Sequence, residues 1–176
     1  AATLAKGTTT LVNAACEPEI VDLGECLMKM GAEIEGLGTD TITIHGKTFM
    51  RGTEHRVIAD RIEVGTFVAA AGMTGGKLIL KDCNIAHIDY MLEPLHKAGV
   101  DITASGKDIA VKRVSDHVMG VDIVTEPYPG FPTDLQAQFM TMLTQCEGAG
   151  MVTETIFENR FMHVPELVRL GAKISI

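Results

Sequence analysis

The pattern of hydrophobic and polar positions repeats three times along the chain. Each repeat contains a strand pattern, then an amphipathic helix that ends in glycine, then the alternating pattern of a β-hairpin. The helices end at Gly31, Gly99 and Gly171, because glycine readily adopts the left-handed backbone that terminates a helix. The sequence therefore predicts three copies of a βαββ subdomain.

The first copy has the clearest pattern. Residues 8–13 are rich in β-branched side chains, which is typical of a strand. Pro18 suits the first turn of the following helix, whose apolar positions keep helical spacing as far as Met30. Residues 32–35 and 41–44 alternate with period two, which predicts a hairpin.

The second copy follows the same order. Its strand lies at residues 77–80, and its helix is expected to begin at Asp89, which would act as the cap. The apolar residues of this helix fall on one face. The hairpin is predicted from strands at 100–103 and 109–112.

The third copy starts in the same way but does not finish. It predicts a strand at residues 151–156, a helix starting at Pro165 and the beginning of another strand at residues 173–176. The chain also opens without an initiator methionine. We therefore expect it to be an excised part of a longer chain.

Two further helices are predicted between the copies, at residues 60–71 and 133–146. In the second of these helices, Leu135, Phe139 and Met142 lie on one face of a 3.6-residue period. The complete subdomain is therefore α-β-α-β-β, and the fold class is α/β (α+β).

Residues 46–59 interrupt the repeats, with Gly52 and a cluster of charged side chains. We interpret this stretch as the crossing between two lobes. An ordinary surface loop between repeats is the alternative.

Composition narrows the function classes. With 46% hydrophobic and 22% charged residues the chain can bury a core, and a net charge of -8 without a basic run predicts no nucleic-acid partner. The 4 cysteines are far apart and lack zinc spacing, so we expect free thiols and no metal site. No apolar segment is long enough for a membrane helix, and no signal peptide is recognisable. We expect a cytoplasmic protein that does not contact a membrane.

Two long motifs carry a family resemblance. Residues 131–139 have the sequence FPTDLQAQF, and residues 154–167 have the sequence ETIFENRFMHVPEL. Together with residues 13–22 and 59–67, they closely resemble the UDP-N-acetylglucosamine enolpyruvyl transferases, which begin peptidoglycan synthesis. The resemblance extends over nearly the whole chain.

The resemblance implies a fold and a reaction. Members of that family have two lobes of three repeats each, arranged as an inside-out barrel, so this chain would hold three repeats of six. Residues 1–57 would be the last repeat of one lobe, and residues 58–176 the first two repeats of the other. The family transfers the enolpyruvyl group of phosphoenolpyruvate to the 3'-hydroxyl of UDP-N-acetylglucosamine, and no cofactor is implied.

The same resemblance implies roles for five residues. Asp134 would orient the sugar hydroxyl and act as the base, and Arg160 would clamp an anion or close the lobes. Ile156 would contact the sugar nucleotide through its backbone. Thr133 would add a hydroxyl contact and Arg61 a further charge.

Four of these residues also have an ordinary structural interpretation. Thr133 as an N-cap with Asp134 in the first turn is typical of a helix start. Arg160 suits a surface ion pair, and Ile156 suits a buried strand position.

The family's proton-donating cysteine and its phosphoenolpyruvate-binding lysine lie outside the window that this chain matches. We therefore expect no turnover from the chain by itself. The alternatives are a sugar-nucleotide binding module and a scaffold that self-associates through truncated sheet edges. The enolpyruvyl transferase of the shikimate pathway is the alternative enzyme.

Overall fold

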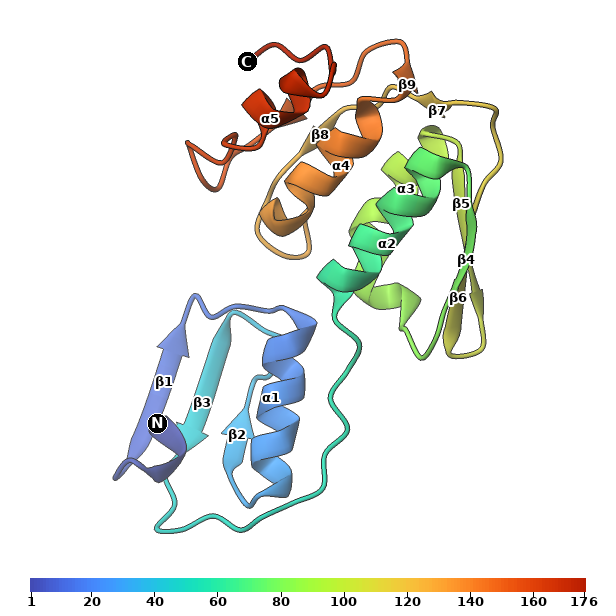
Figure 1. The fold of residues 1–176 in the computed structure, drawn as a ribbon. Coiled ribbons are helices and arrows are strands. Elements are labelled where there is room, and N and C mark those ends of the chain that lie inside the picture. The colour runs from blue at the N-terminus through green and yellow to red at the C-terminus, as the bar shows by residue number, and fades with distance from the viewer. The chain divides into compact units, whose positions relative to one another are not determined.

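The computed structural model describes residues 1–176. The chain separates into two compact units, Ala1–Ile58 and Ala59–Ile176 (Figure 1). Each unit has an apolar core of its own, and no residue belongs to both cores.

The first unit is one βαββ repeat, as the sequence predicts. Its elements are β1 (Thr8–Val12), α1 (Pro18–Lys29), β2 (Glu33–Glu35) and β3 (Thr41–His45), preceded by the 3-10 helix Ala2–Leu4. The sheet has the order β1-β3-β2 with antiparallel pairs. Ile20 and Leu27 of α1 pack against a small core of Ala32, Ile34 and Ile42.

Residues 46–58 form no helix or strand but are bonded to α1 and to the residue that follows it. The amide of Arg51 donates to the carbonyl of Met30. His55 Nε2 lies 2.9 Å from Asp22 Oδ1, and these side chains are only 8% and 11% exposed. The stretch that interrupts the repeats therefore belongs to the first unit and packs against its helix.

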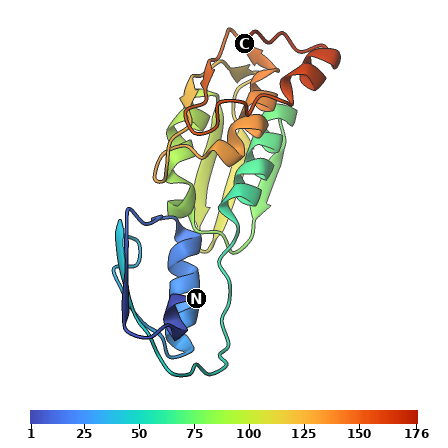
Figure 2. The same ribbon diagram turned by 90° about the vertical axis from the view of Figure 1, so that its left-hand side faces the viewer.

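The second repeat forms the centre of the second unit. Its elements are α2 (Arg61–Thr74), β4 (Lys77–Leu80), α3 (Asp89–Lys97), β5 (Val100–Ser105) and β6 (Asp108–Arg113). The sheet order β4-β6-β5 repeats that of the first unit. Helices α2 and α3 cover one face of this sheet (Figure 2).

The starts of these two helices differ in their chemistry. Asp60 caps α2, because its Oδ1 accepts hydrogen bonds from the amides of Ile62 (2.8 Å) and Glu63 (3.1 Å). The prediction that Asp89 caps α3 is wrong. A 3-10 helix, Ile85–Ile88, precedes α3 and is capped by the side chain of Asn84, so Asp89 is already inside helical structure.

With 14 residues, α2 is the longest helix of the chain. None of the helices is both long and apolar enough to pass through a membrane.

The helix predicted at 133–146 is shorter than expected. It consists of the 3-10 helix Thr133–Leu135 and α4 (Gln136–Leu143). The extension to residue 146 is wrong because Cys146 pairs with Val118 in a parallel ladder. Four two-residue strands, too short to show a period, make up two such ladders: β7 (Val118–Met119) with β9 (Cys146–Glu147), and β8 (Ile123–Val124) with β10 (Val152–Thr153).

The third copy departs from the first two. Of the strand predicted at 151–156, only Val152–Thr153 forms, because Glu154 accepts the amides of the following turn and removes them from any ladder. Helix α5 (Val164–Arg169) has Pro165 in its first turn, as predicted. Residues 173–176 pair with no strand, so the prediction of a strand there is wrong.

Close packing fixes α4 against α2. Leu135, Phe139 and Met142 are fully buried, as the helical period predicts. A Cβ on Gly65 of α2 would lie 2.4 Å from Leu135 Cδ1, so the helices approach too closely for a side chain there. This contact determines where Thr133 and Asp134 emerge at the start of α4.

Candidate functional site

Two segments bring three of the predicted site residues together. One is the 3-10 helix Thr133–Leu135, and the other is the turn at residues 154–160 that follows β10. Arg160 Nη2 donates to Asp134 Oδ1 at 2.7 Å, and Arg160 Nη1 donates to Thr133 Oγ1 at 3.1 Å. The carboxylate and the guanidinium thus meet at one place on the second unit.

The side chain of Gln136 also holds Arg160, by a hydrogen bond to the Arg160 backbone. The Gln136 side chain is completely buried, and its Nε2 donates to the Arg160 carbonyl at 3.0 Å. Arg160 is therefore fixed at both its main chain and its side chain. Sequence reasoning missed Gln136, because a polar residue in the first turn of a helix gives no sign of such a partner.

Glu154 is the centre of a second group of hydrogen bonds. Its carboxylate accepts from the hydroxyls of Thr125 and Thr133, both at 2.8 Å, and from the amides of Ile156 (2.8 Å) and Phe157 (3.1 Å). Partial burial pushes the pKa of Glu154 upward, but these hydrogen bonds outweigh it and hold the pKa below its ordinary value of 4.5. Glu154 is therefore a carboxylate at neutral pH.

Sequence reasoning missed Glu154 as well. The available signal was an acidic residue two and three positions before the amides of a turn, since carboxylates commonly accept from nearby backbone amides. The bond to Thr125, 29 residues earlier, has no signal in the local sequence.

The alternative interpretation of Thr133 as a helix N-cap is wrong. Pro132 occupies the N-cap position of the 3-10 helix, and no side chain caps it. The Thr133 hydroxyl instead donates to Glu154 Oε2 and accepts from Arg160 Nη1. Thr133 thereby connects the carboxylate of Glu154 to the ion pair.

The ion pair is open to solvent. The Asp134 side chain is 56% exposed and that of Arg160 is 38% exposed. The pair uses one carboxylate oxygen, and the guanidinium has five N–H donors, so several groups remain for a ligand. The Phe157 ring lies 5.5 Å from the guanidinium carbon, which orients the plane of the fork.

Ile156 lies in the turn and not in a buried strand. The residue is 36% exposed, and its amide donates to Glu154. A backbone contact between Ile156 and a ligand would therefore use its carbonyl oxygen.

Arg61 has a different setting, at the start of α2. The residue is only 8% exposed, and its guanidinium carbon lies 5.8 Å from the ring centre of Tyr90 and 5.6 Å from that of Tyr128. These rings orient Arg61 within the packing between α2, α3 and the loop that contains Tyr128.

His163 lies just beyond the ion pair in the sequence. Burial lowers the pKa of His163 below its ordinary value of 6.5, and the positive charge of Arg160 lowers it further. The imidazole is therefore neutral at neutral pH.

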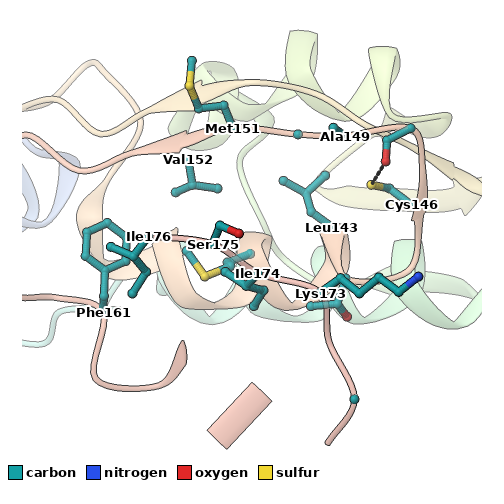
Figure 3. Close-up of a pocket in the computed structure, with 15 residues that line it drawn as sticks. Leu143, Cys146, Ala149, Met151, Val152, Phe161, Lys173, Ile174, Ser175 and Ile176 are labelled. Carbon is teal, nitrogen blue, oxygen red and sulfur yellow. Dashed lines mark hydrogen bonds between the residues drawn. The ribbon is translucent and has the colours of Figure 1, made fainter. Parts of the chain in front are cut away.

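Two cavities of the second unit are lined by residues other than the ion pair. The larger, about 790 Å³, lies between α4 and the end of the chain, and Leu143, Phe161 and Ile174 are among its lining residues (Figure 3). A second, about 550 Å³, lies beside α3 and is lined in part by Tyr90 and Phe131. Asp134 and Arg160 line neither of these two cavities.

Comparison with known proteins places the chain in a family. The family model for EPSP synthase (3-phosphoshikimate 1-carboxyvinyltransferase) matches residues 1–176. The chain is 57% identical over 176 residues to a UDP-N-acetylglucosamine 1-carboxyvinyltransferase of Rhizobium etli and 56% identical to that of Agrobacterium fabrum. It spans 41% of the length of these curated relatives.

Solved structures agree in fold. The enolpyruvyl transferase NikO from Streptomyces tendae superposes with a TM-score of 0.86 at 24% identity, over 99% of this chain and 42% of NikO. An EPSP synthase from Acinetobacter baumannii superposes with a TM-score of 0.62 at 18% identity, over 96% of this chain and 40% of the synthase. The match of the family model to the full chain shows that it belongs to the EPSP synthase family of enolpyruvyl transferases.

Proposed function

We propose that the chain is part of a UDP-N-acetylglucosamine 1-carboxyvinyltransferase, an enzyme of peptidoglycan synthesis. The whole protein would transfer enolpyruvyl from phosphoenolpyruvate to the 3'-hydroxyl of UDP-N-acetylglucosamine. Identity of 57% along the full chain supports this branch of the family over the shikimate branch. Within that protein, this chain would supply part of the sugar-nucleotide site.

The two compact units support an assignment to two lobes. We assign residues 1–57 to the last repeat of one lobe and residues 58–176 to the first two repeats of the other. The boundary between the units falls after Ile58, one residue from the proposed boundary, which supports the assignment.

Asp134 and Arg160 have complementary roles in the proposed reaction. The exposed Asp134 carboxylate would accept a hydrogen bond from the sugar hydroxyl, orient it and take its proton. Arg160, with N–H donors left over, would bind a carboxylate or phosphate group of the second substrate. Because the two side chains are 2.7 Å apart, both substrates would meet at this pair.

The remaining predicted residues would assist. The carbonyl of Ile156 would accept a hydrogen bond from the sugar nucleotide, and Thr133 would hold Arg160 in position. Arg61 would support the site indirectly, through the packing of Tyr90 and Tyr128.

The convergence of Asp134 and Arg160 is the single observation that carries this proposal, and calorimetry tests it. Titration of the chain with UDP-N-acetylglucosamine should give saturable heat, and Asp134→Asn should weaken binding by roughly tenfold or more. Asp116→Asn, at an exposed position elsewhere on the same unit, serves as the matched control and should bind normally. No heat at millimolar ligand excludes the proposed site.

The exposed edges of the first sheet favour a second role, self-association of the chain. Strands β1 and β2 are the edges of the first sheet, and Val12 of β1 is 78% exposed. Such an edge can pair with a second copy of the chain. Size exclusion distinguishes this behaviour, because self-association raises the apparent mass with concentration and a monomer does not.

We also propose a cytoplasmic location. All four cysteines, Cys16, Cys26, Cys83 and Cys146, are free thiols. Free thiols are typical of a reducing compartment. Labelling with a thiol reagent in intact and lysed cells tests this, with reaction expected only after lysis for a reagent that does not enter cells.

A further inference from the structure

We propose that Glu154 is the positioning residue of this site: its carboxylate fixes the Thr133 hydroxyl and the turn at 156–160, and through them it holds Arg160 against Asp134. The effect on the ion pair follows from the hydrogen bonds alone. The consequence for sugar-nucleotide binding rests on the function proposed above.

Four hydrogen-bond donors surround the Glu154 carboxylate. Oε1 accepts from the hydroxyl of Thr125 and from the amides of Ile156 and Phe157, and Oε2 accepts from Thr133. All four donors are neutral, so oriented dipoles stabilise the charge without a cation. A carboxylate held in this way has one defined orientation.

Thr125 makes the position of Glu154 rigid. Thr125 is completely buried, and its Oγ1 accepts from the Thr155 amide at 2.9 Å while donating to Glu154. The carbonyl of Thr125 accepts a hydrogen bond from the Thr155 hydroxyl. The carboxylate is thereby tied to the core of the unit.

The hydrogen bond between Thr133 and Glu154 has a defined direction. A hydroxyl has a single proton, and Thr133 gives it to Glu154 Oε2. The lone pairs of Thr133 Oγ1 are therefore free to accept from Arg160 Nη1 at 3.1 Å. Without an acceptor at position 154, the hydroxyl proton could turn toward the guanidinium and oppose this contact.

Glu154 also fixes the backbone of the turn that contains Arg160. Glu154 fixes the amide of Phe157, whose carbonyl accepts from the amide of Arg160 at 3.1 Å. The ring of Phe157 also lies 5.5 Å from the Arg160 guanidinium carbon. One carboxylate thus sets both the main chain and the side-chain surroundings of Arg160.

The substitution Glu154→Gln tests the proposal, because it keeps the shape and replaces one acceptor oxygen by an NH₂ donor. Glu158→Gln, an exposed glutamate of the same turn, is the matched control. In the free chain, ¹⁵N NMR should show that the Arg160 Nη1 and Nη2 groups, which bond Thr133 and Asp134, exchange more slowly in the wild type and in Glu158→Gln than in Glu154→Gln. Fast exchange is expected in Glu154→Gln.

Variants of Thr133 separate positioning from general loss of structure. Thr133→Ser keeps the hydroxyl and should keep slow exchange at Arg160, whereas Thr133→Val should lose it. If Glu154→Gln does not fold, Thr133→Val tests the same connection. Unchanged Arg160 signals in a folded Glu154→Gln, or in Thr133→Val, would overturn the proposal.

Binding provides the second measurement. Affinity for UDP-N-acetylglucosamine should fall roughly tenfold in Glu154→Gln, and little further when Glu154→Gln is added to Thr133→Val. Absence of wild-type binding refutes the proposed function, while the Arg160 signals still decide the role of Glu154. Normal affinity in Glu154→Gln refutes the role of Glu154 in binding.

Discussion

At the scale of single residues, exposure separates a structural ion pair from a functional one. The Asp134 and Arg160 side chains are 56% and 38% exposed, and exposed pairs contribute only about 0–1 kcal/mol to stability. The fold therefore depends little on this pair. A ligand with complementary charge would gain more from it, because binding excludes water from the same groups.

Substitution of Asp134 should accordingly leave the fold intact. Asp134→Asn is expected to change the free energy of unfolding by less than about 1 kcal/mol, because the carboxylate is exposed. Urea denaturation measures this change. A loss of several kcal/mol would instead assign the pair to the framework of the unit.

The pH dependence of stability should reflect Glu154 and His163. Both groups have folded-state pKa values below their ordinary values of 4.5 and 6.5, Glu154 because its hydrogen bonds outweigh burial and His163 because of burial and Arg160. The unfolded chain therefore takes up these protons first as the pH falls. Stability is complete above 6.5, falls as His163 protonates and falls again below 4.5 as Glu154 protonates.

Urea unfolding at a series of pH values checks this order. The His163→Gln variant should lose the part of the decrease that begins near 6.5 and keep the part below 4.5. A wild-type decrease near 6.5 that the His163→Gln variant fully retains would contradict the assignment.

The sequence indicated the charged residues of the site but not the residues that hold them in position by hydrogen bonds. Asp134 and Arg160 stood out through the family resemblance, and the structure brings them together. Gln136 and Glu154 act through partners 24 and 29 residues away, which only the folded chain brings near. Long-range hydrogen bonds of this kind leave no local pattern.

At the scale of elements, the spacing of apolar residues predicted the helices and strands of the two complete repeats. The two complete repeats form because each combines a helical stripe with a two-residue alternation long enough to recognise. The third copy fails where side-chain chemistry competes with strand pairing. Glu154 accepts hydrogen bonds from the amides of Ile156 and Phe157, so part of the stretch predicted as a strand becomes a turn.

The parallel ladder between β7 and β9 depends on close backbone approach at Gly120. A Cβ on Gly120 would lie 2.2 Å from the carbonyl oxygen of Ala149, and a backbone atom cannot move aside cheaply. Gly120→Ala should therefore destabilise the second unit by about 1–3 kcal/mol. Thermal or urea unfolding measures this change in the free energy of unfolding.

Gly76→Ala is the matched control for this substitution. The nearest atom to a Cβ there is Thr74 Oγ1 at 3.4 Å, an ordinary contact. We expect a change within about 0.5 kcal/mol. Equal losses at both glycines would show that close approach at Gly120 is unimportant.

At the scale of the whole molecule, we propose that this chain holds only part of a catalytic site. It spans 41% of the length of its curated relatives. Incubation with UDP-N-acetylglucosamine and phosphoenolpyruvate should therefore release no phosphate above buffer. A phosphate assay checks this, and measurable turnover would show that the chain contains a complete catalytic site.

The most direct measurement is an NMR titration of the ¹⁵N-labelled chain with UDP-N-acetylglucosamine. We predict that the amide signals of residues 133–136 and 154–160 shift together and saturate at one ligand concentration, because these segments surround the Asp134–Arg160 pair. The signals of β4 and β5, on the sheet, should stay in place. Shifts confined to the cavity beside residues 173–176, or no shifts at all, would contradict a sugar-nucleotide site at this pair.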